Sequence, residues 1–289
     1  MFQQLGLIGC GLIGGSFALA LRQAGLVRRV IGYSKSPSTT ERARQLGVID
    51  TGAPSALQAV AGADLVVLAV PVAATESTLS AIRHGLGEQT LLMDVGSTKG
   101  DVVQAGLRAL QHQAGNFVPA HPIAGKEVAG VEHAEGALFV GRHVILTPTE
   151  RSRAEQVQRA IEVWSRIGAR VLTMDAASHD AALAAVSHLP HLLAFAFMQS
   201  VAQQPDGARW LELAGPGFRD FSRIAAGDPA VWRDILLANR EEVLRQSRAF
   251  RETLADFEAQ IAAGDASALS DAIGRASRAR AALKPAFSH

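Results

Sequence analysis

The sequence predicts a doubly wound α/β domain followed by an all-α helical domain. In the first half of the chain, short apolar runs alternate with helical stretches. Most of these runs are apolar throughout, as expected of parallel strands that helices cover on both faces. Beyond Ala176 no segment has a strand pattern. The 289 residues can form about two domains with separate cores. We therefore expect a dinucleotide-binding domain over 1–174 and a helical domain over 175–289.

The pattern predicts each element in turn. The expected strands are Leu5–Ile8, Arg29–Tyr33, Leu65–Val70, Thr90–Asp94, Phe117–Ala120, His143–Thr147 and Arg170–Met174. The expected helices of the first domain are Leu12–Ala24, Thr39–Leu46, Ala74–Gly85, Gly100–Gln113 and Arg151–Ile167. Those of the second are Ala176–Gln203, Ala208–Phe218, Ala230–Gln260 and Ala266–Leu283. Because Asp180–Met198 is apolar nearly all round, we expect it to be buried in a core or a dimer interface.

A glycine-rich loop joins the first strand to the first helix. Its sequence, Gly9-Cys10-Gly11-Leu12-Ile13-Gly14, matches the G-x-G-x-x-G fingerprint in the strand–loop–helix context that dinucleotide binding requires. Gly9 permits the tight turn, Gly11 lets the pyrophosphate approach, and Gly14 lets the helix pack closely. The expected cofactor contacts also include Val70 and Pro71, at the end of the third strand. The alternative is a glycine-rich turn that holds no ligand. The context favours a Rossmann-type domain.

The residues after the second strand indicate which cofactor binds. An NAD-preferring site usually places an acidic residue about 20 residues past the loop, bonded to the ribose 2′-hydroxyl. Ser34 holds that place here, and Lys35, Ser36 and Thr39 follow it. These side chains offer positive charge and hydrogen bonds to a 2′-phosphate. We therefore predict NADP as the preferred cofactor, with NAD as the alternative if the loop does not discriminate.

Two further strand ends carry polar residues. Ser97 follows the strand Thr90–Asp94, and His121 follows Phe117–Ala120. Ligands of open α/β sheets bind outside the carboxyl ends of the strands, so both side chains should face the cofactor crevice. His121 suits a general base because the ordinary pKa of histidine lies near neutrality. We expect Ser97 to orient His121 by a hydrogen bond. The alternative for His121 is a loop histidine that only caps or packs.

The helical domain contains a histidine pair and an arginine of interest. His188 and His191 are three residues apart, a spacing that could suggest a metal. No H-E-x-x-H motif or cysteine partner accompanies them, so we expect no metal. Arg223 could clamp a substrate carboxylate through two hydrogen bonds. A surface or inter-subunit salt bridge is the alternative for Arg223.

Five motifs together resemble the prephenate/arogenate dehydrogenase family of tyrosine biosynthesis. They are G-C-G-L-I-G-G-S, D-V-G-S-T-K, H-P-I-A-G-K-E-V-A-G, V-S-H-L-P-H and G-F-R-D-F-S-R-I-A, and the likeness extends from Gly6 to about Arg251. The family oxidises the ring carbinol of prephenate or arogenate and releases CO2. The resemblance implies that His121 is the base for the carbinol hydroxyl and that Ser97 positions it. It also implies that the helical domains pair into a homodimer.

The resemblance also assigns the substrate contacts. Arg223 and His191 would hold carboxylate groups, and the further matched positions that line or gate the site are Lys126, Glu127, Ser187, Asp220 and Trp232. Lys126 departs from the family, in which a small polar residue such as threonine is common there. Ser34 matches the NADP-preferring members. Glu127 could favour the ammonium group of arogenate, so we expect arogenate, or both substrates, rather than prephenate alone.

Two other classes remain open from the sequence. A β-hydroxyacid or pyrroline-carboxylate reductase type of enzyme would also join a Rossmann domain to helices. The β-hydroxyacid enzymes need a catalytic lysine and asparagine on the first helices of the second domain, and Ala176–Gln203 contains neither residue. A non-catalytic NADP-sensing module would need the glycine loop but not the convergence of His121, Ser97 and Arg223 on one crevice.

Composition indicates the partners and the compartment. With a net charge of +1 and 19% charged residues, the chain gives no reason to expect nucleic acid or an anionic membrane as a partner. Its one cysteine fits a reducing compartment. The N-terminus lacks a signal-peptide pattern, and the apolar run Leu189–Met198 is too short to span a bilayer. We therefore expect a cytoplasmic protein that acts on a small molecule.

Overall fold

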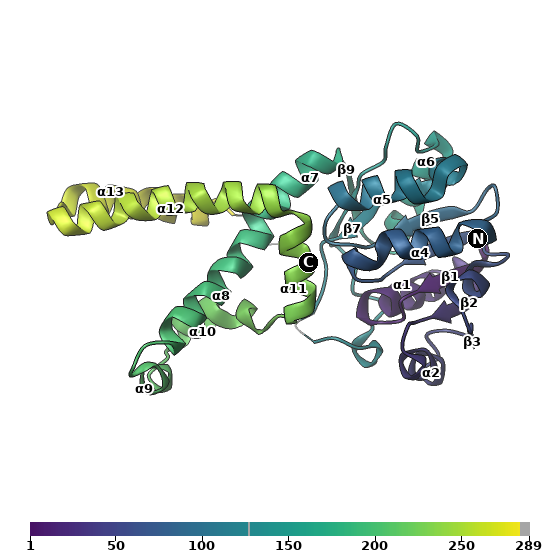
Figure 1. Ribbon diagram of the computed structural model, residues 1–289, viewed down its shortest axis with the longest axis horizontal. Coiled ribbons are helices and arrows are strands. Elements are labelled where there is room, and N and C mark those ends of the chain that lie inside the picture. Colours follow the sequence, from purple (N-terminus) through teal and green to yellow (C-terminus); the bar gives the residue numbers. More distant parts are fainter. Residues whose placement is uncertain (127, 284–289) are drawn as a thin grey trace.

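The computed structural model describes residues 1–126 and 128–283 as an α/β part from which a helical part projects (Figure 1). The strands are β1 (Phe2–Ile8), β2 (Val27–Tyr33), β3 (Thr51–Gly52), β4 (Leu65–Leu68), β5 (Leu91–Asp94), β6 (Phe117–Val118), β7 (Ala120–Pro122), β8 (His143–Leu146) and β9 (Arg170–Thr173). The helices of the α/β part are α1 (Leu12–Gln23), α2 (Pro37–Gln45), α3 (Ala56–Val60), α4 (Thr75–Ile82), α5 (Gly100–Leu110) and α6 (Ala154–Arg166). The helical part contains α7 (Ala176–Leu183), α8 (Leu189–Ala202), α9 (Gly207–Glu212), α10 (Pro216–Ser222), α11 (Pro229–Ala238), α12 (Arg240–Ala263) and α13 (Ala266–Ala281).

Six parallel strands form the main sheet, in the order β3-β2-β1-β4-β5-β6. Successive side chains of β4 enter two different cores: Leu65 joins the core under α1 and α6, and Val66 joins the core under α3, α4 and α5. Helices thus cover both faces, which is why the strands are apolar throughout. The strand order reverses direction between β1 and β4, where such folds bind their ligands. The predicted doubly wound α/β domain followed by helices is confirmed.

The last strands depart from the expected single sheet. Instead of one strand over Phe117–Ala120, the chain changes partner at Pro119, which has no N–H to donate to a continuous ladder. β6 stays parallel to β5, whereas β7 pairs antiparallel with β8, and β8 pairs parallel with β9. The bend carries His121 on a strand of this second, three-stranded sheet. Two short elements that the sequence did not predict, β3 and α3, complete the main domain.

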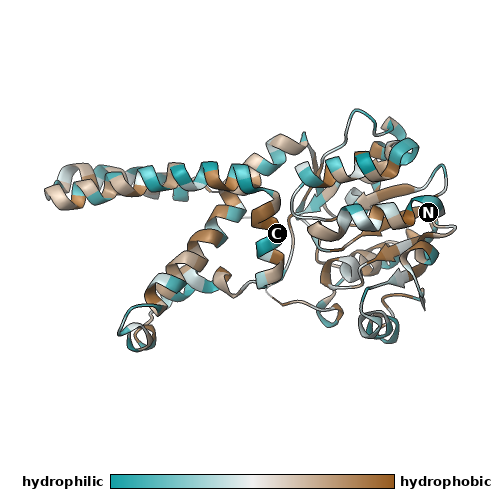
Figure 2. Ribbon diagram, in the orientation of Figure 1, coloured by the Kyte–Doolittle hydropathy of each residue, from teal (hydrophilic) through white to brown (hydrophobic). Residues whose placement is uncertain are grey.

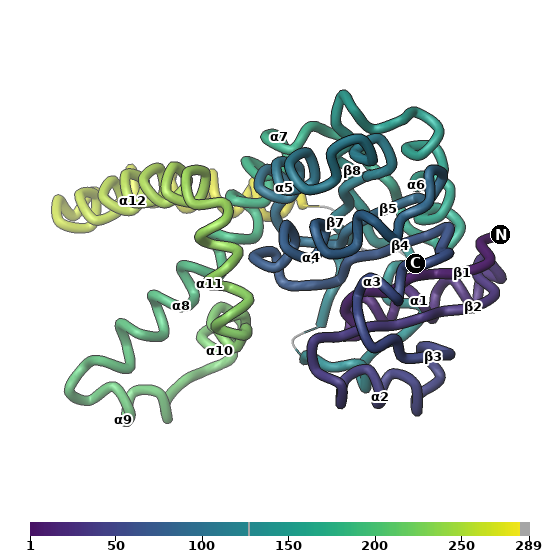
Figure 3. Tube along the Cα trace, turned by 45° about the vertical axis from the view of Figure 1, so that its right-hand side comes forward, coloured from purple at the N-terminus to yellow at the C-terminus, as the bar shows by residue number. Residues whose placement is uncertain are grey.

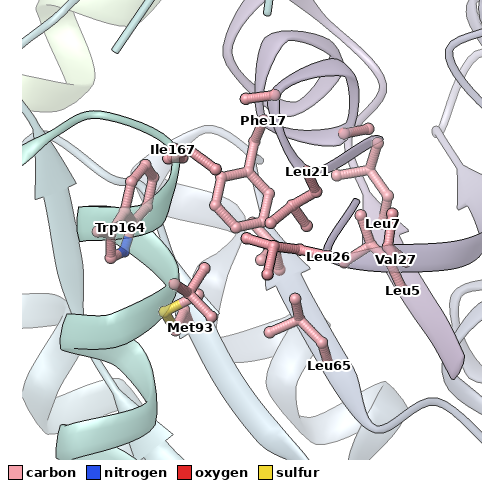
Figure 4. Packing of buried hydrophobic residues seen from close by; sticks show 14 of the residues in the cluster. Leu5, Leu7, Phe17, Leu21, Leu26, Val27, Leu65, Met93, Trp164 and Ile167 are labelled. Atoms are coloured by element: carbon pink, nitrogen blue, oxygen red, sulfur yellow. The ribbon is translucent and has the colours of Figure 1, made fainter. Parts of the chain in front are cut away.

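An aromatic cluster anchors the core beneath α1. Phe17 lies with its ring centroid 4.8 Å from that of Trp164 on α6, and the Phe139 ring is 5.3 Å from Trp164. All three side chains are fully buried. Figure 4 shows Phe17 between Trp164 and the leucines of the first βαβ unit. This packing fixes α1, and with it the glycine loop at its N-terminus.

The helical part is more broken than the sequence predicted. The expected helix Ala208–Phe218 ends at Glu212, and a new helix begins at Pro216, a residue that is favoured in the first turn of a helix. The expected helix Ala230–Gln260 ends at Ala238 and restarts at Arg240. Between them, the buried Asn239 leaves helical geometry and donates a hydrogen bond to the Asp180 carbonyl, 2.8 Å away. A tertiary contact therefore overrides local helix propensity there.

One long apolar helix runs through the centre of the helical part. A π-helical segment, Ala184–His188, joins α7 and α8, so the helix extends over Ala176–Ala202. Among the described residues it is the one helix whose length and composition would allow it to cross a membrane; it is longer than the run Leu189–Met198 because the π segment continues it. α8 is largely apolar (Figure 2), yet within one chain much of it is only partly buried. The burial expected of Asp180–Met198 is therefore incomplete in a single chain.

Candidate functional site

The glycine loop has the geometry of a phosphate cradle. Gly9 has a φ of +96°, and a Cβ atom there would lie 2.1 Å from the Ala69 carbonyl oxygen. A Cβ on Gly14 would lie 2.1 Å from the Gly9 carbonyl oxygen, whereas one on Gly11 would meet nothing within 4 Å. The N-cap residue of α1 is Gly11, which has no side chain to cap the helix, and the first turn of α1 holds no acidic residue. The loop is therefore tightly packed at Gly9 and Gly14 and open at Gly11. On the open side its backbone amides can bind an anion, which fits a dinucleotide pyrophosphate.

The segment after β2 is tied to this loop. The Cys10 amide donates to Ser34 Oγ at 2.8 Å, and the Ser34 amide donates to Thr40 Oγ1 at 3.0 Å. Lys35 and Ser36 are exposed beside it. Thr39 lines a groove of about 520 Å³ between α2 and residues 130–132. The predicted cofactor residues after β2 therefore cluster next to the glycine loop.

The remaining predicted cofactor residues surround the same loop. Leu12 and Ile13 are half-buried in the first turn of α1. Val70 and Pro71 directly follow Ala69, whose carbonyl lies against Gly9. They lead into a short 3₁₀ segment, Val72–Ala74, that packs against α11 of the helical part. The cofactor side of the crevice therefore borders the helical domain.

His121 is buried and hydrogen-bonded to a residue that the sequence did not single out. Its Nδ1 lies 2.8 Å from Nε2 of His179, and His179 Nδ1 lies 2.8 Å from Asp180 Oδ1. Burial lowers the pKa of His121 well below its ordinary value of 6.5, and the nearby charges of His179, Lys99 and His188 lower it further. His121 is therefore neutral at pH 7, the state in which it can accept a proton.

Asp180 is fixed at the N-terminus of α5. The Lys99 amide donates to Oδ1 at 2.8 Å, and the Gly100 amide donates to Oδ2 at 2.7 Å. A Cβ on Gly100 would lie 2.8 Å from Oδ2, so the absence of a side chain permits this approach. Burial works to raise the pKa of Asp180, but the hydrogen bonds from His179 and the two amides outweigh it and lower that pKa. Asp180 is therefore a carboxylate.

A buried ion pair lies beneath this arrangement. Lys99 Nζ lies 2.5 Å from Asp94 Oδ2 and donates to the Ala120 carbonyl at 2.8 Å; the Lys99 side chain is 0% exposed and that of Asp94 3%. Asp94 also accepts from the Gly96 and Ala120 amides. The pair joins the end of β5 to Ala120, the residue before His121, and so helps to fix the position of His121.

A second aromatic and histidine cluster lies on the helical side. The His191 ring stacks on Trp232, with 3.6 Å between centroids and an interplanar angle of 21°. His191 Nδ1 donates to the Ser187 carbonyl at 2.9 Å, which leaves Nε2 as an acceptor in the neutral ring. Burial lowers the pKa of His191. Its neighbour His188 is buried, and burial is the largest cause that lowers its pKa to about 4.

The predicted site residues are not all equally engaged. Ser97 is half-buried in the loop before α5, and within the described residues no hydrogen bond joins it to His121; His179 holds that position instead, so the expected Ser97–His121 bond is absent. Exposed Lys126 pairs with Glu135 at 3.0 Å and donates to the His133 carbonyl. Glu127 lies outside the described residues.

The three remaining positions lie on the helical part. Ser187 is in the π segment, and its carbonyl orients His191. Asp220 is exposed on α10. Arg223 begins the 3₁₀ segment Arg223–Ala226, which packs against α8, the helix of His191. No group of three or more His, Cys, Asp or Glu side chains in residues 1–126 and 128–283 could hold a metal ion.

Comparisons with known proteins identify the family. The sequence profile of the prephenate dehydrogenase nucleotide-binding domain matches residues 17–173, and that of the prephenate dehydrogenase dimerization domain matches residues 175–275. A cyclohexadienyl dehydrogenase of Zymomonas mobilis is 34% identical over 98% of this chain and 97% of its own length.

Two solved structures extend the likeness. Aquifex aeolicus prephenate dehydrogenase, in complex with hydroxyphenyl propionate and NAD+, has a TM-score of 0.92 at 33% identity, covering 98% of this chain and 99% of its own. Synechocystis arogenate dehydrogenase has a TM-score of 0.82 at 29% identity, covering 96% and 99%. These matches span both domains of the chain.

Proposed function

Because the chain belongs to the prephenate dehydrogenase family, we propose that it converts arogenate, or both arogenate and prephenate, with NADP as the preferred cofactor. The activity common to this family is that of a nicotinamide-dependent dehydrogenase that oxidises a ring carbinol with decarboxylation. The observation that carries the proposal is the neutral, buried His121 of the α/β domain, which is hydrogen-bonded to His179 of the helical domain. The family match favours a prephenate-type dehydrogenase over a β-hydroxyacid dehydrogenase or a non-catalytic sensor.

The residues of this chain account for the proton chemistry. His121 Nε2 takes up the carbinol hydroxyl proton as the carbon–hydrogen bond of that carbon breaks. The bound nicotinamide supplies the acceptor for the hydride. When the ring carboxylate leaves as CO2, the electrons of the broken carbon–carbon bond make the ring aromatic, and the oxygen regains the proton from His121. The reaction therefore needs no further proton donor or acceptor.

The helical side of the crevice would recognise the side chain of the substrate. Arg223 is the candidate for a carboxylate, because a guanidinium donates two parallel hydrogen bonds to it. His191, expected from the sequence to hold a carboxylate as well, presents Nε2 as an acceptor when neutral. An acceptor suits an ammonium group better than a carboxylate. This supports arogenate as a substrate, in keeping with the Zymomonas relative named for cyclohexadienyl substrates.

A spectrophotometric assay with both substrates and both cofactors tests the proposed function. We expect reduction of NADP with arogenate, and a tyrosine product that chromatography identifies. Activity with prephenate alone would overturn the substrate proposal, and no activity with either substrate would overturn the function.

The cofactor preference depends on Ser34. We expect a higher kcat/KM for NADP than for NAD, and reversal of that order in Ser34→Asp. Aspartate can still accept the Cys10 amide, but its charge would repel the 2′-phosphate by about 1 to 4 kcal/mol, which corresponds to roughly tenfold or more in affinity. Ser34→Asn, neutral and of similar size, is the matched control. A wild-type enzyme that prefers NAD would contradict the assignment.

Arg223→Ala is expected to raise the substrate KM by about tenfold or more with a smaller change in kcat, because a charged hydrogen-bond donor to the carboxylate is lost. Steady-state kinetics at saturating cofactor measure the effect. The matched control is Arg219→Ala on the adjoining helix, whose exposed side chain donates to the Ala214 carbonyl. If KM is unchanged in Arg223→Ala, the residue does not anchor the substrate.

We also propose a cytoplasmic homodimer in which a second copy covers the helical part. The match to a dimerization domain supports this, as do the apolar side chains that one chain leaves exposed there. The most exposed of these are Val186, Leu213, Leu237, Ile261 and Leu283. Burial of the apolar helix Ala176–Ala202 against a copy is the alternative to a membrane. Sedimentation at micromolar concentration, without detergent, measures the assembly.

A further inference from the structure

Asp180 fixes the direction of the hydrogen bonds in the buried relay, which we define as His121, His179 and Asp180. Both carboxylate oxygens of Asp180 already accept backbone amides at the start of α5. A carboxylate has no proton to donate, so His179 must donate to it through Nδ1–H. In the neutral ring, Nε2 of His179 is then an unprotonated acceptor.

The protonation of His179 also fixes the direction of its hydrogen bond with His121. Because His179 Nε2 accepts, His121 must donate to it from Nδ1–H across the 2.8 Å contact. The neutral His121 ring therefore carries its lone pair on Nε2, the nitrogen on the side away from His179. One buried carboxylate thus selects the tautomer of two histidines in sequence and leaves the outer nitrogen free to accept a proton.

The relay crosses the boundary between the two domains. His121 lies on β7 of the α/β domain, whereas His179 and Asp180 lie in the first helix of the helical domain. That helix packs against α5, whose N-terminal amides hold Asp180 (Figure 3). The His179 side chain is 0% exposed, so no water competes for either of its nitrogens. The orientation of the base on one domain is therefore set by the docking of the other.

We propose that His179 and Asp180 are positioning residues for the reaction, and that together they hold His121 in the Nδ1–H tautomer and stabilise the imidazolium form. The inference rests on the proposed function. As the substrate O–H bond breaks, the proton bonds to His121 Nε2, and the positive charge is shared through His179 with the Asp180 carboxylate. The same proton returns to the oxygen when CO2 leaves. The bound nicotinamide would accept the hydride, and the proton transfer needs no group beyond His121 and the substrate.

Other charges also face this relay. Lys99 at the start of α5, His188 in the π segment and, when it is itself protonated, His179 oppose a positive charge on His121. Asp101 in the first turn of α5 interacts with Asp180, and Asp94 neutralises Lys99. Asp180 is the carboxylate hydrogen-bonded to the histidine chain itself. Replacing Asp180 should therefore affect the protonated form of His121 more than replacing any other charged group of this paragraph.

Two substitutions of the relay test the proposal. In Asp180→Asn the amide can donate to His179 Nδ1, which would reverse both hydrogen bonds and place the proton on His121 Nε2. We expect kcat to fall by about 100-fold or more, with the KM for the cofactor changed less than threefold. His179→Leu should lose a similar factor. His179→Gln, whose carbonyl can still accept from His121, should recover at least about tenfold of that loss.

The matched control is Asp175→Asn in the same helix. Asp175 caps α7 through the Ser178 amide and is exposed, and asparagine is an equally good cap. Its kcat should stay within twofold of wild type. If the relay only supported the fold, Asp180→Asn, His179→Leu and His179→Gln would all have a lower melting temperature. The kcat values of His179→Leu and His179→Gln would then be the same.

Long-range ¹⁵N–¹H spectra of histidine-labelled protein report the tautomers without any turnover. We expect Nδ1–H forms for His121 and His179 in the wild type, and Nε2–H forms in Asp180→Asn. An Nε2–H form of wild-type His121 would overturn the proposal, as would wild-type kcat in Asp180→Asn. If the spectra are as expected but neither substrate is turned over, the proposed function fails and the tautomer control by Asp180 stands.

Discussion

Replacing His121 by asparagine is expected to lower kcat by about 100-fold or more. General-base assistance contributes on the order of 10²- to 10⁴-fold, and asparagine cannot accept the hydroxyl proton. Its amide can still donate to His179 Nε2, 2.8 Å from the replaced Nδ1, so the surrounding relay should persist. Cofactor affinity should change little because the glycine loop is separate. Steady-state kinetics and fluorescence titration with NADP measure the two quantities.

The wild-type pH profile provides the counterpart of this prediction. Activity requires neutral His121, and burial first, then His179, Lys99 and His188, lowers its pKa well below 6.5. The activity should therefore stay level as the pH falls to 6.5 and decline only below it. The acid limb should be missing from the residual activity of His121→Asn. If the kcat of His121→Asn were within tenfold of the wild-type value, His121 would be excluded as the base.

The local parts of the site could be predicted from the sequence. Gly9, Gly11 and Gly14 are adjacent in the chain, and their fingerprint depends on backbone sterics that any strand–loop–helix unit repeats. His121 could be identified because it follows an apolar strand, whose carboxyl end faces the crevice. Both depend on short-range order, which the amino-acid pattern encodes directly.

The relay could not be predicted in the same way. His179 lies 58 residues from His121, and Asp180 lies 81 residues from the Lys99 amide that holds it. Their meeting depends on how α7 docks on α5, which no local pattern specifies. The adjacent His-Asp pair at the start of the second domain was the one available signal. The sequence pattern instead predicts that Ser97, the polar side chain at a neighbouring strand end, orients His121.

The structure departs from the predicted fold at two places, and both departures have the same cause. The sheet divides at Pro119 because the residues on either side pair with β5 and with β8, strands that are distant in the chain. The helix before α12 breaks at Asn239 because its amide bonds both the Asp180 carbonyl and His188 Nδ1. Each break satisfies a tertiary hydrogen bond, and each contributes to placing His121 or Asp180.

The second large effect is expected for Lys99→Met, which should destabilise the protein by about 3 to 5 kcal/mol. The substitution leaves the Asp94 carboxylate buried without a counter-charge, and the cost of an unpaired buried charge is of this order. The Ala120 carbonyl also loses its donor. Urea denaturation followed by circular dichroism measures the free energy of unfolding. Removing this positive charge should also raise the pKa of His121 and move the acid limb of activity to higher pH.

Two comparisons separate the buried pair from charge removal in general. Arg108→Met breaks an ion pair with Glu76 in which both side chains are about half exposed, and solvent screens it, so the free energy of unfolding should change far less than in Lys99→Met. Adding Asp94→Asn to Lys99→Met removes the stranded charge and should restore part of the lost stability, although asparagine satisfies fewer of the Gly96 and Ala120 amides. A loss below 1 kcal/mol in Lys99→Met would show that Asp94 takes up a proton or water in the mutant. The pair would then be unnecessary for holding the strand beneath His121.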